Sequence, residues 1–518
     1  MLLPKLKASQ PDATLLATQS ANSHPCHTDG SPLVVTGPVL LLCFLPMLLK
    51  KFKSKLSGGS WDAFQAKMEA EGLDPAAISA FKYNFDKLTS GESLFLPEDS
   101  ITPVVELPTY KDLSREDSSL LTKTVMLKLN GGLGTGMGLD KAKSLLTVKQ
   151  GMTFLDIIAE QVLHIRRKFG VDLAFMLMNS FSTSKDTLAA LSKYSKLQSA
   201  GLPLEFLQNK APKIVEADLT PASYPLNPAN EWCPPGHGDL YAALVGSGTL
   251  DALLEKGFKY MFVSNSDNLG ATMDLKLLTW FAESGAPFAM EVAARTDADK
   301  KGGHLARGAS GGLLLREIAQ CPDEDADAFQ DVSKHKFFNT NNLWLDLEAL
   351  KETLANFNGV MPLPVISNRK TVNPRDKKST KVLQLETAMG SAIECFTGSL
   401  AIEIPRSRFA PVKTTGDLLA LSSDAYEVTS DSQVVLRASR HNIPPIVKLD
   451  DCFKFVDQLA VLTTGGVPSL IKCSKLTVEG KVLFAPNIVI QGAVKFINKG
   501  DDFKVIPTRT YKDETVEL

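Results

Sequence analysis

A glycine-rich loop followed by two lysines is the part of the sequence best suited to bind phosphate. Residues 124–144 read Thr-Val-Met-Leu-Lys-Leu-Asn-Gly-Gly-Leu-Gly-Thr-Gly-Met-Gly-Leu-Asp-Lys-Ala-Lys-Ser. The apolar run Val125 to Leu129 predicts a buried strand that opens into the loop. Glycine has no Cβ, so the loop can turn sharply and bring backbone N–H groups close to an anion. Together with Lys141 and Lys143, it predicts a phosphate site.

The spacing of this loop excludes two common phosphate-binding motifs. A P-loop requires G-x-x-x-x-G-K-[ST], but Ala142 stands before Lys143 where the second glycine should be. The dinucleotide fingerprint G-x-G-x-x-G fails because Met137 takes the third glycine position after Gly132 and Gly134. A hydride-transfer enzyme is therefore disfavoured. A structural turn without ligand is the remaining alternative, although so many glycines are costly in chain entropy.

Two further loops place polar residues where they could act on a substrate. In residues 231–239, Pro-Pro-Gly-His-Gly-Asp sets His237 on a stiff loop, and Asp239 is expected to cap the helix that follows. In residues 261–270 an apolar strand ends at Asn-Ser-Asp, which places Asp267 to hold Mg²⁺ together with substrate phosphates. A structural histidine and an Asx-type turn are the alternatives. Residues 406–415 carry three cations, which alone would indicate a charged linker.

The composition is that of a globular enzyme rather than a nucleic-acid-binding protein. The chain has 518 residues, enough for two or three domains, with 44% hydrophobic and 22% charged residues. A formal net charge of −2 offers no positive excess for a phosphate backbone, so no nucleic-acid partner is expected. The seven cysteines form no C-x-x-C pair, which indicates a reducing compartment and no structural zinc.

The order of apolar runs predicts how these loops are positioned. Residues 57–120 are expected to be mainly helical and to brace the core. Residues 121–425 alternate apolar runs with amphipathic stretches, as in an α/β sheet, and Thr153 is expected to cap one of its helices. Ligands of such folds bind beyond the carboxyl ends of the strands, where the candidate loops fall.

The last part of the chain has a different repeat. In residues 426–518 apolar residues recur every six positions, from Leu470 through Leu476 to Val494, with Gly480 and Gly492 between them. This period predicts a parallel β-helix whose sides are two residues long. An antiparallel β-meander is the alternative.

The first 56 residues form an extension with several interpretations. Residues 1–32 are mostly polar, and residues 30–49 are uncharged with a strongly apolar end, followed by lysines. A disordered tail or gene-model artefact, with Met47 starting a complete enzyme, is one interpretation. A membrane anchor is another, with the catalytic part on the cytoplasmic side, and a targeting segment is the third.

Several of these segments resemble the UDP-glucose pyrophosphorylase (UTP–glucose-1-phosphate uridylyltransferase) family. Residues 129–138 match its Leu-Asn-Gly-Gly-Leu-Gly-Thr-x-Met-Gly signature, and the matches continue in order through residues 231–239 and 261–270 to 408–413. The resemblance implies a Rossmann-like nucleotide-diphospho-sugar transferase (GT-A-like) α/β core with a C-terminal left-handed parallel β-helix. It also implies a cytoplasmic, Mg²⁺-assisted enzyme that makes UDP-glucose and pyrophosphate from UTP and glucose 1-phosphate by in-line attack on the α-phosphorus.

The resemblance also assigns roles to individual residues. It implies Lys143 and Lys413 as catalytic cations and Asp267 as the metal ligand. The nucleotide-binding residues would be Leu129, Asn130, Gly131, Gly132, Lys143, Gln208, Gly236, Asp267 and Lys413. The sugar-phosphate-binding residues would be His237, Asn265, Ser266, Asp267, Gly302, Glu317 and Asn341. An exposed strand end at Gln208, and caps or surface turns at the sugar-side residues, are the alternatives.

One departure from the family pattern and, beside the disfavoured hydride-transfer enzyme, two functional alternatives remain. Lys141-Ala142 stands where many members have Gly-Pro, which leaves open which lysine reaches the phosphates. A related UDP-sugar or UDP-N-acetylhexosamine pyrophosphorylase is one alternative, and a non-catalytic membrane-tethered paralogue is another. Self-association through the C-terminal domain and membrane contact by residues 30–49 are further expectations.

Overall fold

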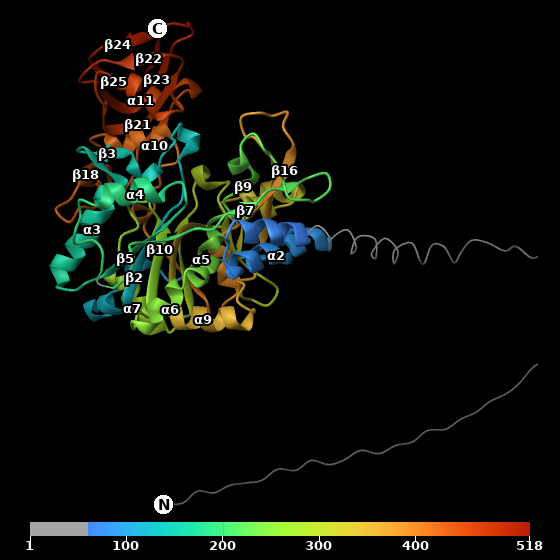
Figure 1. Cartoon of the computed structure of the whole chain (residues 1–518). Coiled ribbons are helices and arrows are strands. Elements are labelled where there is room, and N and C mark those ends of the chain that lie inside the picture. The colour runs from blue at the N-terminus through green and yellow to red at the C-terminus, as the bar shows by residue number, and fades with distance from the viewer. Residues whose placement is uncertain (1–60, 200) are drawn as a thin grey trace, which may run out of the picture. The chain divides into compact units, whose positions relative to one another are not determined.

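The computed structural model describes residues 61–199 and 201–518 (Figure 1). The extension 1–56, with its uncharged segment 30–49 and Met47, lies outside the described residues. Within those two ranges, the structure has no helix that is both long and apolar enough to cross a membrane.

Two helices open the described chain and pack through aromatic rings. Residues 61–70 form the first. Helix α2 (Pro75–Ser90) follows, with the side chain of Asp74 accepting a hydrogen bond from the N–H of Ala76 as its N-cap. The rings of Phe64 and Phe85 lie 5.0 Å apart between these helices. The region predicted to be mainly helical is α-helical only as far as Ser90, and residues 91–120 are mostly irregular with short 3-10 turns.

A mixed ten-stranded sheet forms the core and confirms the predicted α/β class. Its main path runs β1-β12-β14-β10-β2-β5-β6, with β11, β13 and β17 paired beside it. Strands β10, β2, β5 and β6 are parallel, whereas β14 is antiparallel to β10. The strands are β1 (Thr102–Pro103), β2 (Thr124–Asn130), β5 (Ala174–Asn179), β6 (Glu205–Leu207), β10 (Tyr260–Asn265), β11 (Phe288–Ala294), β12 (His304–Arg307), β13 (Leu313–Arg316), β14 (Phe337–Asp346) and β17 (Leu400–Glu403).

Helices cover both faces of this sheet because its strands are apolar on both sides. In β2, Met126 packs with α3 and α7, while Val125 and Leu127 pack on the other face with α5, α6 and α9 (Figure 1). The side chain of Thr153 accepts from the N–H of Asp156 (3.1 Å), which confirms its predicted capping role. The helices are α3 (Phe154–Phe169), α4 (Ser184–Leu191), α5 (Leu240–Gly246), α6 (Thr249–Glu255), α7 (Leu275–Ser284), α8 (Ala326–Gln330) and α9 (Leu347–Asn356).

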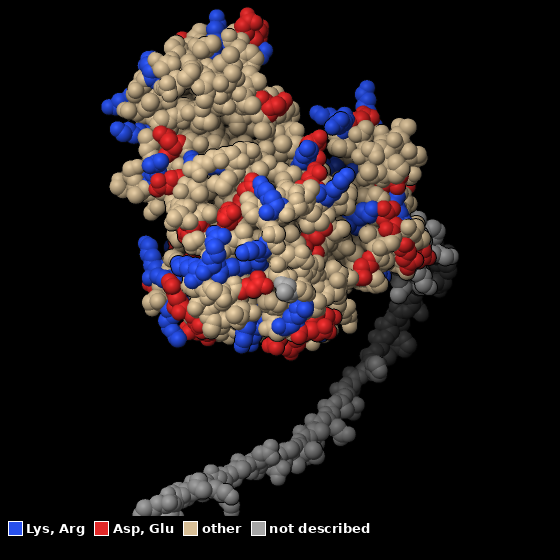
Figure 2. All heavy atoms as spheres, turned by 60° about the vertical axis from the view of Figure 1, so that its left-hand side comes forward, with Lys and Arg blue, Asp and Glu red and all other residues tan. Residues whose placement is uncertain are grey.

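Smaller sheets flank the core. The hairpin of β15 (Val365–Thr371) and β16 (Lys381–Thr387) pairs with β8 (Ile214–Val215). The other short pairs are β3 (Thr147–Lys149) with β4 (Met152–Thr153), β7 (Ala211–Pro212) with β9 (Trp232–Cys233), and β18 (Tyr426–Val428) with β19 (Val434–Leu436). On the face shown in Figure 2, basic and acidic side chains are interspersed.

From Ile446 onward the C-terminal part consists of parallel sheets, as the six-residue repeat predicted. Leu476 of β21 pairs with Val494 of β23, 18 positions further on, so a coil has three sides of six residues each, and the predicted side length of two residues is wrong. Gly480 has a left-handed φ of 79°, and a Cβ there would stand 2.0 Å from the carbonyl oxygen of Asn498, which explains the glycine between two repeats. The elements are α10 (Thr415–Ser422), β20 (Ile446–Lys448), α11 (Val456–Leu462), β21 (Ser469–Glu479), β22 (Val482–Phe484), β23 (Val489–Ile497), β24 (Lys504–Ile506), β25 (Thr510–Lys512) and β26 (Thr515–Glu517).

Candidate active site

The glycine-rich loop folds back on itself directly after β2. The N–H of Lys143 donates to the carbonyl oxygen of Gly132 (3.1 Å), and Gly134 takes a left-handed φ of 62° between them. Gly131 is needed for a different reason, because a Cβ there would stand 2.6 Å from Oε1 of Gln208. The loop thus brings a lysine and a glutamine from distant segments to its own backbone.

Lys143 reaches the acidic turn that follows β10. Its Nζ lies 2.7 Å from Oδ2 of Asp267, and the two side chains are 18% and 21% exposed. Lys141 is exposed, and within the described ranges the structure shows it making neither a hydrogen bond nor an ion pair. The geometry therefore singles out Lys143 as the lysine that faces Asp267.

Three residues predicted to bind the nucleotide gather at the start of the loop. Nε2 of Gln208 donates to the carbonyl oxygen of Gly236 (2.9 Å), and Oε1 of Gln208 lies against Gly131. A Cβ on Gly236 would meet the backbone of Thr387 at 2.5 Å, so this position also requires glycine. These contacts bring the loops after β2, β6 and β9 together at one corner.

Asn130 and Ser266 are occupied with each other. The Ser266 hydroxyl donates to Oδ1 of Asn130 (2.9 Å), and Nδ2 of Asn130 donates to Oδ1 of Asn179 (2.7 Å). Both side chains are buried, as is Leu129. Their side chains therefore hold the ends of three parallel strands in register.

The residues predicted to bind the sugar phosphate largely share one cavity. It has a volume of about 350 Å³. The predicted residues in its lining are Asn265, Asp267, Gly302, Glu317, Asn341 and Lys413, and the remaining ones are Asn268, Asp299, Lys301, Gly303, Phe338, Asn339, Phe409 and Pro411. This lining supplies amide and carboxylate groups for hydroxyls and two lysines for an anion. His237, Gln208 and Gly236 lie outside the lining.

A bulge in the sheet places Asn341 in the lining of this cavity. The register between β11 and β14 shifts so that Glu291 pairs with Asn342 and Val292 with Asn339, which leaves two residues of β14 unpaired. Asn341 lies in this bulge with a left-handed φ of 59°. Bulges are frequent beside active sites because they redirect a side chain. A position of this kind is strained for most residues but tolerated by asparagine.

Glu317 and Lys413 face the same cavity with opposite charges. Burial raises the pKa of Glu317, while the nearby Lys413 ammonium lowers it. Glu317 also packs against Gly303, where a Cβ would stand 2.5 Å from its carboxylate. The side chain of Lys413 is exposed, so it can approach a ligand in the cavity.

His237 is held as a neutral ring. Its Nδ1 accepts a hydrogen bond from the N–H of Met389 (2.9 Å), and burial lowers the pKa of His237 to about 4 while the residue as a whole is only half-buried. Since Nδ1 is an acceptor, the proton of the neutral ring lies on Nε2, which can donate to a ligand.

The expectation that Asp239 caps helix α5 is wrong. Its side chain makes no capping hydrogen bond within the described part of the chain. Its oxygens accept instead from the backbone N–H and the side-chain amide of Asn209, at 2.7 and 3.0 Å.

Sequence reasoning missed a buried ion pair beneath the cavity. Glu291, fully buried in β11, accepts from Nε and Nη2 of Arg408 (2.9 and 2.8 Å). It also accepts from Nδ2 of Asn342 and Nε1 of Trp344. The pair anchors the segment that leads to Lys413. A lone carboxylate within the apolar run Phe288–Ala294 was a detectable signal, since buried charges need partners.

Sequence reasoning also missed Lys128, a charged residue within the apolar run Val125 to Leu129. It is fully buried in β2, where burial lowers its pKa to about 7, and Nζ donates to the carbonyl oxygen of Ala271 (2.7 Å). This bond ties β2 to the turn that carries Asp267.

Comparison with known proteins covers all of the site residues described above. Residues 78–491 match a family model described as UTP–glucose-1-phosphate uridylyltransferase. An enzyme of that name from Solanum tuberosum is 40% identical over 409 residues, which covers 78% of this chain and 82% of the relative. Another from Saccharomyces cerevisiae is 38% identical over 451 residues, which covers 84% of this chain and 88% of the relative.

Solved structures agree in fold and sequence. A variant of UDP-glucose pyrophosphorylase from Leishmania major, in complex with UDP-glucose, has a TM-score of 0.84 at 46% identity and covers 89% of this chain and 99% of that chain. A UDP-glucose phosphorylase from Trypanosoma brucei has a TM-score of 0.83 at 48% identity, with coverage of 89% and 100%. The likeness therefore spans nearly the whole of those chains.

Proposed function

The chain belongs to the UTP–glucose-1-phosphate uridylyltransferase family, and we propose from this how its residues divide the reaction between two substrates. The enzyme makes UDP-glucose and pyrophosphate from UTP and glucose 1-phosphate. The observation that carries the assignment of roles is the contact between Lys143 and Asp267. It joins the glycine-rich loop to an acidic turn beside a polar cavity.

UTP binds over the glycine-rich loop. The backbone of Leu129, Asn130, Gly131 and Gly132 receives the nucleotide, since the Asn130 side chain is already bonded. Gln208 and Gly236 contact the uracil, and Lys143 meets the α-phosphate. The convergence of Gln208, Gly131 and Gly236 on one corner supports this arrangement.

Glucose 1-phosphate occupies the polar cavity. Asn265, Glu317 and Asn341 bind the hydroxyl groups, with the backbone of Gly302 beside them. We assign the phosphate to His237, which lies outside the lining of this cavity and donates from Nε2. Ser266, next to Asn265 in the chain, is fixed by its bond to Asn130.

The reaction is a single in-line displacement. The phosphate oxygen of glucose 1-phosphate attacks the α-phosphorus of UTP, the bond to the β-phosphate oxygen breaks, and pyrophosphate leaves. No covalent intermediate with the protein is needed, so catalysis rests on positioning and charge neutralisation. Lys143 and Lys413 hold the negative charge that gathers on the phosphates.

Asp267 fits the requirements of a Mg²⁺ ligand. In the described residues no three His, Cys, Asp or Glu side chains converge as in an all-protein metal site. Mg²⁺ usually takes only one or two carboxylates and completes its shell with phosphate oxygens and water. Asp267, partly exposed at the end of β10, offers such a carboxylate. When bound, the ion adds positive charge to the phosphates.

We assign residues 57–120 to a bracing region, 121–425 to a GT-A-like catalytic domain and 426–518 to a left-handed β-helix domain. The parallel pairing after residue 446 supports the last assignment.

Exposed apolar side chains in residues 426–518, including Phe503 and Val505, support self-association through this domain. The five cysteines of the described residues are free thiols, which supports a cytoplasmic location.

Pyrophosphate release from UTP with a panel of sugar phosphates tests the function. We expect the purified enzyme to release pyrophosphate with glucose 1-phosphate and Mg²⁺ at a kcat/KM at least tenfold above that with galactose 1-phosphate or N-acetylglucosamine 1-phosphate, because polar sites reject mismatched hydroxyls strongly. A preference for either of the other sugars would assign a sibling activity. No release with any sugar would favour a non-catalytic paralogue.

Substitution of Asn341 separates its side chain from its backbone conformation. We expect Asn341→Gly to raise KM for glucose 1-phosphate roughly three- to tenfold, the value of one hydrogen bond, with little change in stability. Asn341→Ala should raise KM equally and also lower the free energy of unfolding by about 1–2 kcal/mol, because alanine is strained at φ 59°. Equal KM values for Asn341→Gly and the wild type would exclude Asn341 from the sugar site.

A further inference from the structure

Asp239 is a buried carboxylate to which the reaction above gives no role. Its side chain is only 7% exposed. Burial raises the pKa of Asp239 to about 7, although hydrogen bonds from Asn209 lower it. Burying a carboxylate is costly unless it is hydrogen-bonded, so the hydrogen-bond partners of Asp239 indicate its role.

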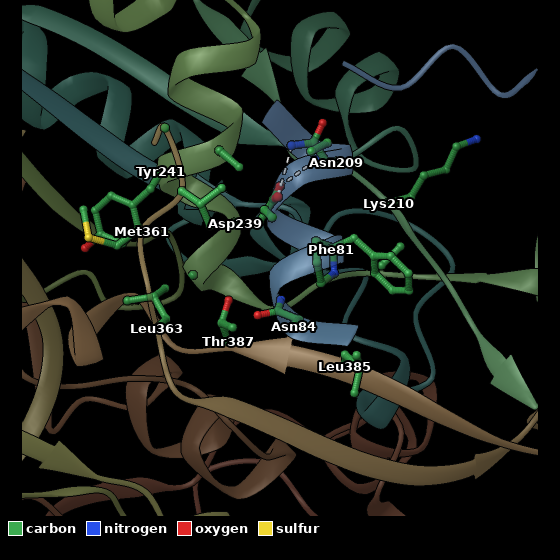
Figure 3. A pocket seen from close by; sticks show the side chains of 18 residues that line it. Phe81, Asn84, Asn209, Lys210, Asp239, Tyr241, Met361, Leu363, Leu385 and Thr387 are labelled. Atoms are coloured by element: carbon green, nitrogen blue, oxygen red, sulfur yellow. Dashed lines mark hydrogen bonds between the residues drawn. The ribbon is translucent and has the colours of Figure 1, made fainter. Parts of the chain in front are cut away.

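Both oxygens of Asp239 accept from a single residue. The N–H of Asn209 donates to Oδ2 (2.7 Å) and its Nδ2 donates to Oδ1 (3.0 Å), as Figure 3 shows. Asn209 directly follows Gln208, whose own N–H donates to the carbonyl oxygen of Asn179 at the end of β5. Gln208 is therefore held by β5 on one side and by Asp239, through Asn209, on the other.

The same contacts close a ring around the base-binding corner. Nε2 of Gln208 donates to the carbonyl oxygen of Gly236, three residues before Asp239. Gly238 in between is wedged against β16, since a Cβ there would stand 2.3 Å from the Thr387 hydroxyl. The chain from Gly236 to Asp239 thus holds both ends of the Gln208–Asn209 segment.

Packing alone does not fix this corner. A cavity of about 40 Å³ lies beneath it, between α2, the loop that carries Asp239 and the end of β16 (Figure 3). Asn84 of α2 lines this cavity at 8% exposure, and none of the residues that the structure describes hydrogen-bonds its side chain. Its lining is mostly apolar, with Asp239, Asn84 and Asn209 among the few polar residues, so the space beside Asp239 is not filled by close packing. The orientation of Gln208 therefore depends on directional hydrogen bonds.

Orientation matters because a glutamine amide reads two patterns. Uracil offers an N–H next to a carbonyl oxygen, whereas cytosine offers a ring nitrogen acceptor next to an amine. A glutamine amide pairs with uracil in one orientation and, after a turn of 180°, with cytosine in the other. An amide whose nitrogen is held against the carbonyl of Gly236 keeps one orientation.

We propose that Asp239 is a positioning residue for base recognition, which acts through Asn209 to hold Gln208 in the orientation that prefers UTP over CTP. The proposal rests on the proposed function, in which Gln208 and Gly236 contact uracil. When Asp239 is removed, the Gln208–Asn209 segment loses its anchor and the amide turns more freely.

The test compares UTP with CTP in pyrophosphate release with glucose 1-phosphate. We expect Asp239→Ala to raise KM for UTP and lower the UTP:CTP ratio of kcat/KM, each by roughly tenfold, as for a lost hydrogen bond to a charged group. The KM for glucose 1-phosphate should not change. Asp239→Asn, whose carbonyl still accepts from the N–H of Asn209, should keep the ratio within about threefold of the wild type.

Companion variants separate this proposal from the function on which it rests. If Gln208→Ala leaves the UTP:CTP ratio unchanged, the base contact assigned to Gln208 fails and the proposal falls with it. If Gln208→Ala lowers the ratio but Asp239→Ala does not, only the proposal is overturned. Should Asp239→Ala not fold, Asp239→Ser places a hydroxyl that is one bond shorter than the carboxylate and so withdraws from both donors of Asn209. Its ratio then decides: a fall supports the proposal and a wild-type value overturns it.

Discussion

Replacing Lys143 by alanine is expected to lower kcat by roughly 100- to 1000-fold, the usual loss when a preorganised charge stabiliser is removed. Lys143 is held in place twice: its N–H is bonded to Gly132, and its ammonium lies 2.7 Å from Asp267. The charge is therefore in position before substrate arrives. Because it acts mainly on charge that develops in the transition state, kcat should fall more than KM rises. Pyrophosphate release under saturating substrates measures the effect.

Lys141 provides a matched control two residues away. It carries the same charge, is exposed, and has no ion-pair or hydrogen-bond partner in the ranges that the structure describes. We expect Lys141→Ala to keep kcat within about threefold of the wild type, since exposed charges act weakly. Near-normal turnover in Lys143→Ala would refute the assignment. A large loss in Lys141→Ala alone would transfer the catalytic role to that lysine.

The parts of the site that could be predicted from sequence are those whose chemistry is local in the chain. A strand, a glycine-rich loop and a lysine within twenty residues indicate a phosphate site by themselves. The meeting of Lys143 with Asp267 depends on more, because 124 positions separate them. The rule that parallel strands gather their carboxyl ends at one edge places both loops at that edge, and the pairing of β2 with β10, which the structure shows, brings them into contact.

The features of the site that were not predicted from sequence depend on contacts between distant segments, which no local pattern encodes. Asp239 has the sequence position of a helix cap, but Asn209, thirty positions earlier, offers two donors to its carboxylate. The conformation of Asn341 follows from a register shift against β11, which is set by both strands together. The six-residue repeat was easier to interpret because each coil repeats the same local pattern over the whole C-terminal part.

Replacing Glu291 by alanine is expected to lower the free energy of unfolding by about 3–5 kcal/mol, because it leaves Arg408 buried without its partner. Burial opposes the charge on Arg408, but Glu291 outweighs it and raises the Arg408 pKa above its ordinary value. The side chains of Asn342 and Trp344 would also lose their acceptor. Urea unfolding followed by tryptophan fluorescence measures the loss.

An exposed ion pair of equal length is the control. Lys351 and Asp251 also lie 2.8 Å apart, but their side chains are 59% and 63% exposed, so Asp251→Ala should cost less than about 1 kcal/mol. If Glu291→Ala costs no more than Asp251→Ala, the buried pair is not the anchor that we describe. If the pair is the anchor, turnover of the folded variant should also fall, because Arg408 holds the segment that presents Lys413 to the cavity. The buried contact between Glu291 and Arg408, which are 117 positions apart in the sequence, would then set the position of a catalytic cation.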